Sequence, residues 1–226
     1  MGRTIIMSLG GSIIIPDEID VSFLREFKEK IDSKAVKGIK FVIFTGGGRI
    51  ARKYQDAASQ ISKIGEEELD WIGIQATKLN AQLLQKIFGK IAEPVILENP
   101  HEKILLKKSV LIGSGWLPGC STDYDAVIAA KNFSSREIIN MSNIDYVYDK
   151  DPRKNKNVMP FTSLTWKDYR NLICSRWKAG LNAPFDPVAS KEAENLGIKV
   201  IIMGKNLKNM DNYIEGKKFN GTVIGG

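Results

Sequence analysis

The sequence predicts an α/β sandwich with a largely parallel sheet. Three observations support this fold class. Short β-branched runs alternate with helical patterns along the chain, glycine-bearing turns follow three of these runs, and no internal repeat or linker interrupts the alternation. A chain of 226 residues can also bury most of its apolar surface, so one domain is expected.

The strands of the predicted sheet are short, mainly apolar runs that are typical of buried strands. They are residues 4–9, 39–44, 94–97, 109–112, 137–141 and 198–203. Because helical patterns lie between them, the order of elements favours a parallel sheet with crossover helices.

Two helices are expected in the first half of the chain. In residues 20–34, phenylalanine and isoleucine recur at four-residue spacing behind Asp20, a residue type that caps helix N-termini. Residues 66–88 carry leucine and isoleucine on roughly one stripe, which indicates an amphipathic helix.

Two further helices in the second half have recognisable starts. Thr165 and Asp168 form a short capping box for a helix at about 166–175. Asp186 is placed to cap another helix, which has a proline at its first position and Gly197 at its end.

Composition and charge limit the functions to consider. No apolar stretch approaches the roughly 18–20 residues of a membrane span, and the N-terminal run MGRTIIMSLGGSIII lacks a cleavage site, so it indicates a strand rather than a signal peptide. Cys120 and Cys174 form no disulfide or zinc pattern, so a reducing cytoplasm is expected. The net charge of +7 comes from scattered lysines without a nucleic-acid motif. We therefore expect neither nucleic acid nor a membrane as a partner.

Three glycine-bearing turns, at residues 10–12, 46–48 and 113–119, each follow an expected strand. Because the carboxyl ends of parallel strands share one edge of a sheet, these turns can converge on one crevice. Glycine leaves backbone N–H groups open to a ligand, and a helix N-terminus adds positive potential. The stretch RIARKY supplies such a helix start together with Arg49 and Arg52, which suit phosphate oxygens. A single turn of this kind also fits a tight βα connection, and the standard nucleotide fingerprints are absent.

The stretch PGCSTDYDA, residues 118–126, is a second polar cluster. Ser121 and Thr122 are placed as helix caps, with Asp123 and Asp125 in the first turn. These carboxylates either complement the helix dipole, or orient cationic side chains and reach Mg²⁺ through water, as phosphoryl transfer requires.

A third polar cluster, SNIDYVYDKDPRK at residues 142–154, runs from a strand end into a turn. Tyr146 and Tyr148 beside a polar loop suit a purine base, although they also alternate like ordinary strand residues. The following stretch, residues 149–163, is polar and contains prolines, so a long lid-like loop is expected.

Together these motifs carry a family resemblance. They are SLGGS (8–12), TGGGRIAR (45–52), IGIQATKLNAQLL (72–84), PGCSTDYDAV (118–127), SNIDYVYDKDPRK (142–154), AGLNAPFDPVASK (179–191) and NGTVI (220–224). Their order and spacing, from Arg3 to Ile224, resemble the amino acid kinase superfamily and, within it, the archaeal-type UMP kinase family.

The resemblance implies a three-layer αβα sandwich formed by a single domain of residues 1–226. An acceptor lobe would span about residues 1–130, and an ATP-binding lobe would span about residues 131–226. The implied reaction is the Mg²⁺-dependent transfer of the γ-phosphoryl group of ATP to UMP, which yields UDP and ADP for pyrimidine biosynthesis. The implied assembly is a homo-oligomer, usually a hexamer, in the cytoplasm.

For the donor nucleotide, the resemblance implies a set of residues around the ATP phosphates and the adenine. These are Gly10, Gly11, Ser12, Gly48, Arg52, Asn143, Tyr148 and Asp151. For the acceptor, it implies a second set around UMP, in which Asp70 accepts hydrogen bonds from the ribose. These are Gly47, Asp70, Trp116, Leu117, Pro118, Gly119, Cys120, Ser121 and Thr122.

The candidate catalytic residues are Arg52, Asp123 and Lys191. Arg52 and Lys191 are the candidate cations, while Asp123 would hold cationic groups in place rather than act as a base. This suits phosphoryl transfer, because positioning and electrostatic stabilisation supply most of its catalysis. No protein side chain is assigned to the metal, and the single histidine, His101, is interpreted as incidental.

Several positions depart from the family pattern. Ser8 stands where many members of the superfamily have a lysine, so the positive charge must come from elsewhere. Cys120 replaces a histidine or glutamine, Tyr146 replaces a glycine, and Trp116 and Leu117 replace smaller or more polar residues. These last three departures could shift the preference for the acceptor.

Two alternative functions remain open at this point. One is a kinase of the same fold with another acceptor, such as isopentenyl phosphate, acetylglutamate or carbamate. Isopentenyl phosphate kinases have a histidine just after the glycine triplet, where this chain has Arg49. The other alternative is a non-catalytic nucleotide-binding member of the fold, which the serine at position 8 would suit.

Overall fold

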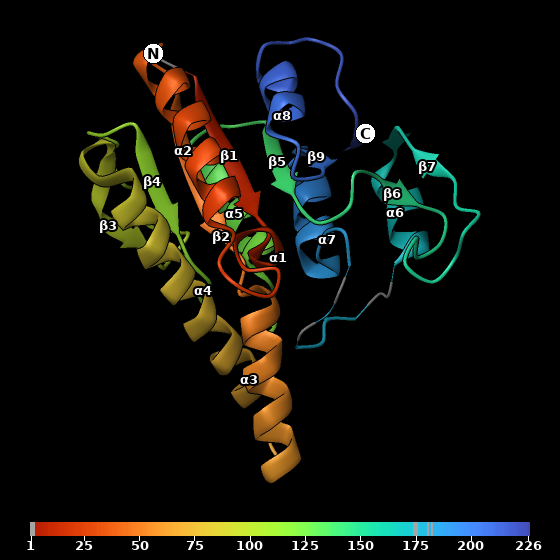
Figure 1. The fold of residues 1–226 in the computed structure, drawn as a ribbon. Coiled ribbons are helices and arrows are strands. Elements are labelled where there is room, and N and C mark those ends of the chain that lie inside the picture. Colours follow the sequence, from red (N-terminus) through yellow and green to blue (C-terminus); the bar gives the residue numbers. More distant parts are fainter. Residues whose placement is uncertain (1–2, 174–175, 180, 182) are drawn as a thin grey trace.

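The structure, a computed structural model, describes residues 3–173, 176–179, 181 and 183–226. Cys174 and parts of the motif at 179–191 therefore lie outside the described residues. Figure 1 shows how the chain runs from the N-terminus, in red, to the C-terminus, in blue.

A sheet of eight strands lies at the centre of this described part of the chain, in the order β3-β4-β2-β1-β5-β9-β10-β8. Its strands are β1 (Thr4–Leu9), β2 (Lys40–Thr45), β3 (Ala92–Leu97), β4 (Val110–Gly113), β5 (Glu137–Met141), β8 (Ser163–Leu164), β9 (Lys199–Met203) and β10 (Thr222–Ile224). All neighbouring strands from β3 to β9 in this order are parallel, β10 is antiparallel to β9, and β8 is parallel to β10. The predicted mainly parallel sheet is confirmed.

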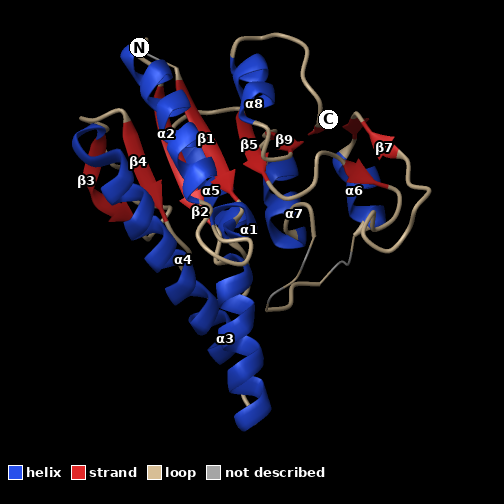
Figure 2. Ribbon diagram, viewed as in Figure 1, coloured by secondary structure: helices blue, strands red, loops and turns tan. Residues whose placement is uncertain are grey.

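Helices cover both faces of the sheet (Figure 2). They are α1 (Gly11–Ile14), α2 (Val21–Val36), α3 (Gly48–Ile61), α4 (Glu66–Phe88), α5 (Thr122–Asn132), α6 (Trp166–Leu172), α7 (Pro187–Asn195), α8 (Leu207–Ile214) and the short 3₁₀ helix η1 (Gly89–Ile91). Buried side chains of α2, α4 and α8 form one apolar cluster, and those of α5, α6 and α7 form a second. The predicted three-layer α/β fold class is confirmed.

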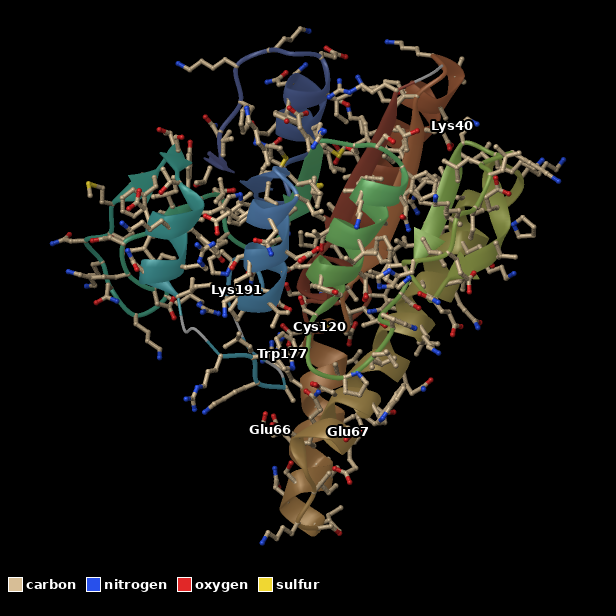
Figure 3. The ribbon with its side chains drawn as sticks, turned by 180° about the vertical axis from the view of Figure 1, so that it is seen from behind. Lys40, Glu66, Glu67, Cys120, Trp177 and Lys191 are labelled. Atoms are coloured by element: carbon tan, nitrogen blue, oxygen red, sulfur yellow. The ribbon has the colours of Figure 1, made fainter. Side chains whose placement is uncertain are left out.

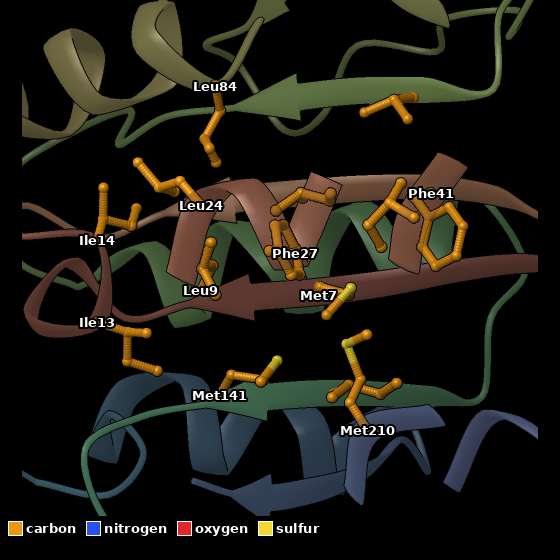
Figure 4. Packing of buried hydrophobic residues seen from close by; sticks show 14 of the residues in the cluster. Met7, Leu9, Ile13, Ile14, Leu24, Phe27, Phe41, Leu84, Met141 and Met210 are labelled. Carbon is orange, nitrogen blue, oxygen red and sulfur yellow. The ribbon is translucent and has the colours of Figure 1, made fainter. Parts of the chain in front are cut away.

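The central strands contribute alternate residues to the two clusters. In β1, Met7 and Leu9 belong to the first cluster, whereas Ile6 belongs to the second. Figure 4 shows Met7 and Leu9 with Phe27 of α2 and Met141 of β5. Because both faces are buried, the strand sequence is apolar throughout rather than alternating.

The helix starts follow the predicted caps. The Asp20 side chain accepts a hydrogen bond from the Phe23 N–H, and the Asp186 side chain accepts hydrogen bonds from the N–H groups of Val188 and Ala189. Each cap satisfies backbone donors that the first turn of a helix leaves free.

Helix α6 is shorter than expected. Its N-terminus is capped by Thr165, as predicted, but it ends at Leu172 and not near residue 175. Ile173 has extended backbone angles (φ −110°, ψ 163°), a conformation that β-branched residues favour. The helix therefore ends at the edge of the site described below, where Leu172 and Ile173 line a cavity.

Several elements were not predicted from the sequence. They are α1, α8, β10, and the hairpin of β6 (Val147–Tyr148) and β7 (Pro160–Phe161). Because β7 and the first residue of β8 fall within residues 149–163, the loop expected there is shorter and connects the two strands of the hairpin. These elements are short, so their hydrophobic patterns are weak.

Helix α3 and the N-terminal part of α4 project beyond the carboxyl edge of the sheet (Figure 1). The two helices pack against each other. None of the described helices combines the length and apolar character needed to span a membrane.

Candidate active site

Two glycine turns meet at the carboxyl edge of the sheet. The Gly46 N–H donates to the Leu9 carbonyl at 2.9 Å, which ties the turn after β2 to the end of β1. A Cβ on Gly11 would lie 2.2 Å from the Gly48 nitrogen, and Gly48 has a φ of 65°. Glycine is therefore needed partly because the two turns touch each other backbone to backbone.

A cavity of about 380 Å³ opens beside the first glycine turn and the β6–β7 hairpin; below it is called the larger cavity. Its lining includes most residues that the sequence assigned to ATP, as well as three residues at the start of α5. These are Gly10, Gly11, Ser12, Arg52, Asn143, Tyr148 and Asp151, with Ser121, Thr122 and Asp123. The larger cavity thus brings together residues that lie far apart in the sequence.

A second cavity of about 150 Å³, the smaller cavity, lies between the glycine triplet, α4 and the loop before α5. Six of the nine residues assigned to UMP are in its lining. The predicted residues in its lining are Gly47, Asp70, Leu117, Cys120, Ser121 and Thr122, with Arg52 and Gly48. Gly48, which was expected on the ATP side, therefore borders this cavity.

The two cavities adjoin at a shared wall. Arg52, Ser121, Thr122 and Leu181 line both of them. A group bound in one cavity would therefore lie next to a group bound in the other, with the Arg52 side chain at the junction.

Arg52 is a half-buried cation. Within the described part of the chain its guanidinium makes neither a hydrogen bond nor an ion pair, whereas the neighbouring Arg49 pairs with Asp17. Burial lowers the pKa of Arg52, and the positive charges of Arg49 and Arg153 add to this effect. The charge of Asp56 opposes these effects. A half-buried cation without an ion pair among the described residues suits an anionic ligand.

Asp123 is surrounded by hydrogen-bond donors. Its Oδ1 accepts from Ser8 Oγ at 2.7 Å and from Asn140 Nδ2 at 2.9 Å, and its Oδ2 accepts from the Asp186 N–H at 3.1 Å. Burial raises the pKa of Asp123 to about 6, although these donors favour the charged form. Ser8, where a lysine is common in the superfamily, thus holds a carboxylate and supplies no charge.

Asp186 has a second function beyond capping α7. It is buried, and its Oδ2 accepts the Ser121 N–H at 2.5 Å while its Oδ1 caps the helix. Burial raises the pKa of Asp186. Asp186 therefore fixes the start of α5 beside both cavities. The sequence indicated this residue only as the cap of α7.

Asp125 is the least satisfied carboxylate near the site. Its Oδ2 accepts the Trp116 N–H at 3.3 Å, while its buried Oδ1 has no hydrogen-bond partner among the residues that the structure describes. Burial raises the pKa of Asp125 well above its ordinary value, so the residue favours the neutral form. It lines neither cavity.

Asp70 of α4 lies in the lining of the smaller cavity and is buried. Its Oδ2 accepts two hydrogen bonds, one from the Gly119 N–H at 2.8 Å and one from Trp177 Nε1 at 2.9 Å. Trp177 also lines this cavity, and Figure 3 labels it beside Cys120. The sequence did not single out Trp177, because no local pattern links it to a residue 107 positions away.

The hairpin loop bordering the larger cavity carries the remaining donor-side residues. Asp151 Oδ1 accepts from Arg153 Nε at 2.9 Å, and this arginine lowers the pKa of Asp151. Tyr148 packs edge-on against Tyr146, with ring centroids 6.2 Å apart. Both aromatic residues therefore belong to one small cluster at the end of β6.

Some predicted residues lie outside both linings. Trp116, Pro118 and Gly119 belong to the loop beside the smaller cavity, and the Trp116 ring lies 5.0 Å from that of His101. Lys191 is exposed on α7 and lines neither cavity (Figure 3). Its predicted role, like those of the other site residues, remains a prediction.

The described residues contain no cluster of three or more His, Cys, Asp or Glu side chains suited to hold a metal ion. Arginine and backbone N–H groups, which suit phosphate, are the prominent groups at the junction.

The fold and the match of the sequence define the class of protein. Residues 3–204 match the model of the amino acid kinase family. Because this match covers most of the chain, the protein belongs to that family.

Within the family, the chain is similar to uridylate kinases. It is 36% identical over 220 residues to that of Thermoplasma volcanium, covering 96% of this chain and 95% of the relative. It is 32% identical over 225 residues to that of Thermococcus onnurineus, covering 97% of this chain and 98% of the relative. The solved uridylate kinase of Archaeoglobus fulgidus is 30% identical with a TM-score of 0.81, covering 98% of this chain and 99% of that chain. The solved UMP kinase of Bacillus anthracis is 21% identical with a TM-score of 0.79, covering 99% of this chain and 96% of that chain. At this identity the likeness supports the fold alone.

Proposed function

We propose that this protein is a UMP kinase, which transfers the γ-phosphoryl group of ATP to UMP and releases UDP and ADP. The proposal is supported by membership of the amino acid kinase family and by relatives named uridylate kinase that align over nearly the whole chain. The single structural observation that carries it is the pair of adjoining cavities with Arg52 at their junction.

The adjoining cavities suit a reaction between two phosphates. Phosphoryl transfer requires the attacking and leaving oxygens to lie roughly in line with the transferred group. Two nucleotide phosphates repel each other, so their approach needs a positive group between them. Arg52 lines both cavities and has no competing partner among the described residues, so it is placed to neutralise this charge.

The larger cavity is the proposed ATP site. The turn of Gly10 and Gly11 offers backbone N–H groups to the phosphates, and Asn143, Tyr148 and Asp151 border the adenine nucleoside. When bound, Mg²⁺ would supply positive charge that offsets the negative charge of the phosphates. No side chain of this chain is proposed as its ligand, and the described residues contain no cluster of three or more His, Cys, Asp or Glu side chains suited to a metal ion.

The smaller cavity is the proposed UMP site. Asp70 is a buried acceptor at its wall and is proposed to bind the ribose hydroxyls. Gly47 and the residues from Leu117 to Thr122 are proposed to enclose the phosphate and the base. The backbone N–H groups at the start of α5 add positive potential on the acceptor side.

Catalysis is proposed to arise from positioning and electrostatics. Holding the two nucleotides in line could supply roughly 7–11 kcal/mol, so no general base of raised pKa is required. Asp123 is assigned a positioning role, since its oxygens already accept three hydrogen bonds. Lys191 lies outside both cavities, so a role in transfer would require its side chain to move.

A panel of acceptors tests the proposal directly. Release of ADP from ATP and Mg²⁺ is measured with UMP, CMP, isopentenyl phosphate, acetylglutamate and carbamate, and the product is identified by chromatography. We expect turnover with UMP and formation of UDP. Turnover with a non-nucleotide acceptor alone would replace UMP by that acceptor, and no turnover with any acceptor would indicate a non-catalytic nucleotide-binding protein.

We further propose that the protein forms a homo-oligomer, with a hexamer as the expected state. The support is a set of exposed apolar side chains on the projecting helices, among them Tyr54, Ile61 and Leu79. A cytoplasmic location, and partners limited to UMP, ATP and further copies of the chain, stay predictions from the sequence.

A further inference from the structure

The connection between α6 and α7 borders both cavities. Of its described residues, Ile173 and Pro184 line the larger cavity, Trp177 lines the smaller cavity, and Leu181 lines both. A single segment of the second half of the chain therefore contributes to the proposed donor and acceptor sites together.

Trp177 joins this connection to α4. Its indole Nε1–H donates to Asp70 Oδ2 at 2.9 Å, and its half-buried ring belongs to the wall of the smaller cavity. Indole has one N–H donor on a large apolar ring, so it can hold a polar partner while it presents an apolar surface to a ligand.

The two oxygens of Asp70 are used differently. Oδ2 accepts both hydrogen bonds, from Gly119 and from Trp177. No described residue donates to Oδ1, and Asp70 lies in the lining of the smaller cavity. Oδ1 therefore remains available to a donor that enters the cavity, such as a hydroxyl group.

We propose that Trp177 is a positioning and specificity residue of the acceptor site. Its N–H group fixes the Asp70 carboxylate so that Oδ1 accepts from the sugar hydroxyls of a pyrimidine ribonucleoside monophosphate. Its ring forms an apolar wall for the same ligand. This inference rests on the proposed UMP kinase function and adds a residue that acts through Asp70.

The matched variants are Trp177→Phe, which keeps an aromatic ring without the N–H donor, and Trp71→Phe. Trp71 neighbours Asp70 in α4 but is exposed and lines neither cavity. In Trp177→Phe we expect the KM for UMP to rise about tenfold, as the loss of a hydrogen bond to a charged group predicts. The KM for ATP and kcat should stay within about twofold. Trp71→Phe should match the wild-type protein.

A double-variant cycle tests whether Trp177 acts through Asp70. Asp70→Asn should raise the KM for UMP far more than the KM for ATP. If the indole acts by orienting this carboxylate, combining Trp177→Phe with Asp70→Asn should add little to the effect of Asp70→Asn alone. Two independent effects would instead multiply.

Tryptophan fluorescence gives a readout that does not depend on turnover. UMP is titrated into the protein without ATP, and the change in emission is compared among the wild type, Trp177→Phe and Trp71→Phe. Contact of the nucleotide with the Trp177 ring should produce most of the change. The change should therefore fall by at least half in Trp177→Phe and persist in Trp71→Phe.

The outcomes separate this inference from the function on which it rests. If the wild-type protein does not phosphorylate UMP, both the proposed function and the role of Trp177 are overturned. If the wild type does phosphorylate UMP, the role of Trp177 alone is overturned by any of three results. These are an unchanged KM for UMP in Trp177→Phe, equal changes in the KM values of both nucleotides, and multiplicative effects in the double variant.

Discussion

Four aspartates near the two cavities use their oxygens in different ways. Asp123 and Asp186 each accept three hydrogen bonds from protein donors, and Asp70 accepts two on one oxygen. Asp125 accepts one and has a buried oxygen without a partner. Asp123, Asp186 and Asp70 fix loops around the proposed ligands. Burial of Asp125 instead destabilises the folded protein, because one of its oxygens has no partner among the described residues.

Arg52→Ala should reduce turnover at least about tenfold, because it removes the cation at the junction of the cavities. The fold should be retained, since Arg52 makes no hydrogen bond or ion pair to the described residues. Steady-state kinetics and the melting temperature are measured together. The matched control is Arg49→Ala, which removes an exposed arginine that pairs with Asp17 and lines neither cavity. Unchanged activity in Arg52→Ala would remove this residue from the site.

Asp125→Asn should stabilise the protein at neutral pH. The pKa of Asp125 is raised well above its ordinary value by burial, so the folded chain holds a proton that the unfolded chain has lost above about pH 4. The wild type therefore loses stability as the pH rises above that value, whereas Asn has no proton to lose. We expect Asp125→Asn to be more stable than the wild type at pH 7.5.

Denaturant unfolding at pH 4 and pH 7.5 measures this effect. The advantage of Asp125→Asn should be near zero at pH 4 and should increase with pH, since only the unfolded wild-type chain releases the proton. Equal or opposite effects at the two pH values would show that Asp125 is not held neutral by burial. Activity should be little affected, because Asp125 lines neither cavity.

At the scale of elements, the contact between the first two glycine turns determines the shape of the junction between the two cavities. A Cβ on Gly48 would lie 2.4 Å from the carbonyl carbon of Gly11. This neighbour is backbone and cannot move aside as a flexible side chain could. The turn after β1 and the helix start after β2 are thus held in one arrangement, from which α3 places Arg52.

Gly48→Ala should destabilise the protein and disable the site. Its positive φ costs about 1–2 kcal/mol with any side chain, and the clash with Gly11 should add about 2 kcal/mol or more. The matched control is Gly216→Ala, because Gly216 has a similar φ of 70° but no heavy atom within 4 Å of the added Cβ. Unfolding free energies that are equal in the two variants would contradict the packing of the turns.

The elements that could be predicted are those with strong local patterns. The runs at β1, β2, β5 and β9 are apolar because both faces of each strand are buried. The amphipathic stripe of residues 66–88 predicted α4 over its full length, from Glu66 to Phe88. The pairing of β10 antiparallel to β9 could not be read in this way, because a three-residue strand has almost no periodicity.

At the scale of the whole molecule, the two halves of the chain meet at the site. The Asp70–Trp177 contact and the hydrogen bonds of Asp186 with Ser121 and Asp123 join residues before 130 to residues after it. The boundary between the two lobes at about residue 130 remains a prediction. Because these contacts connect segments that line both cavities, binding of a ligand in one cavity should influence binding in the other.

The position of the site could be predicted better than its contacts. The motif order predicts that the proposed donor and acceptor residues gather at one edge of the sheet, because parallel strands present their carboxyl ends together. Most of these residues line one of the two adjoining cavities, while their roles remain predictions. Trp177 and the second function of Asp186 were missed. Both depend on tertiary contacts between distant segments, and no local residue pattern encodes such contacts.

Self-association is tested by the mass of the protein in solution. Light scattering should give a multiple of the chain mass of 25.2 kDa, with a hexamer expected. Ile61→Asp places a charge on an apolar residue of α3 that is 85% exposed, so it should reduce the mass while leaving the isolated chain folded. A monomeric wild-type protein would contradict the proposed assembly.

The most direct test of the account is a crystal structure with UMP and a non-hydrolysable ATP analogue bound together. We expect the UMP phosphate in the smaller cavity and the triphosphate in the larger cavity, with Arg52 within about 3 Å of phosphate oxygens. The two phosphates should face each other at the wall that both cavities share. Nucleotides bound elsewhere, or separated so that Arg52 reaches neither phosphate, would contradict the account.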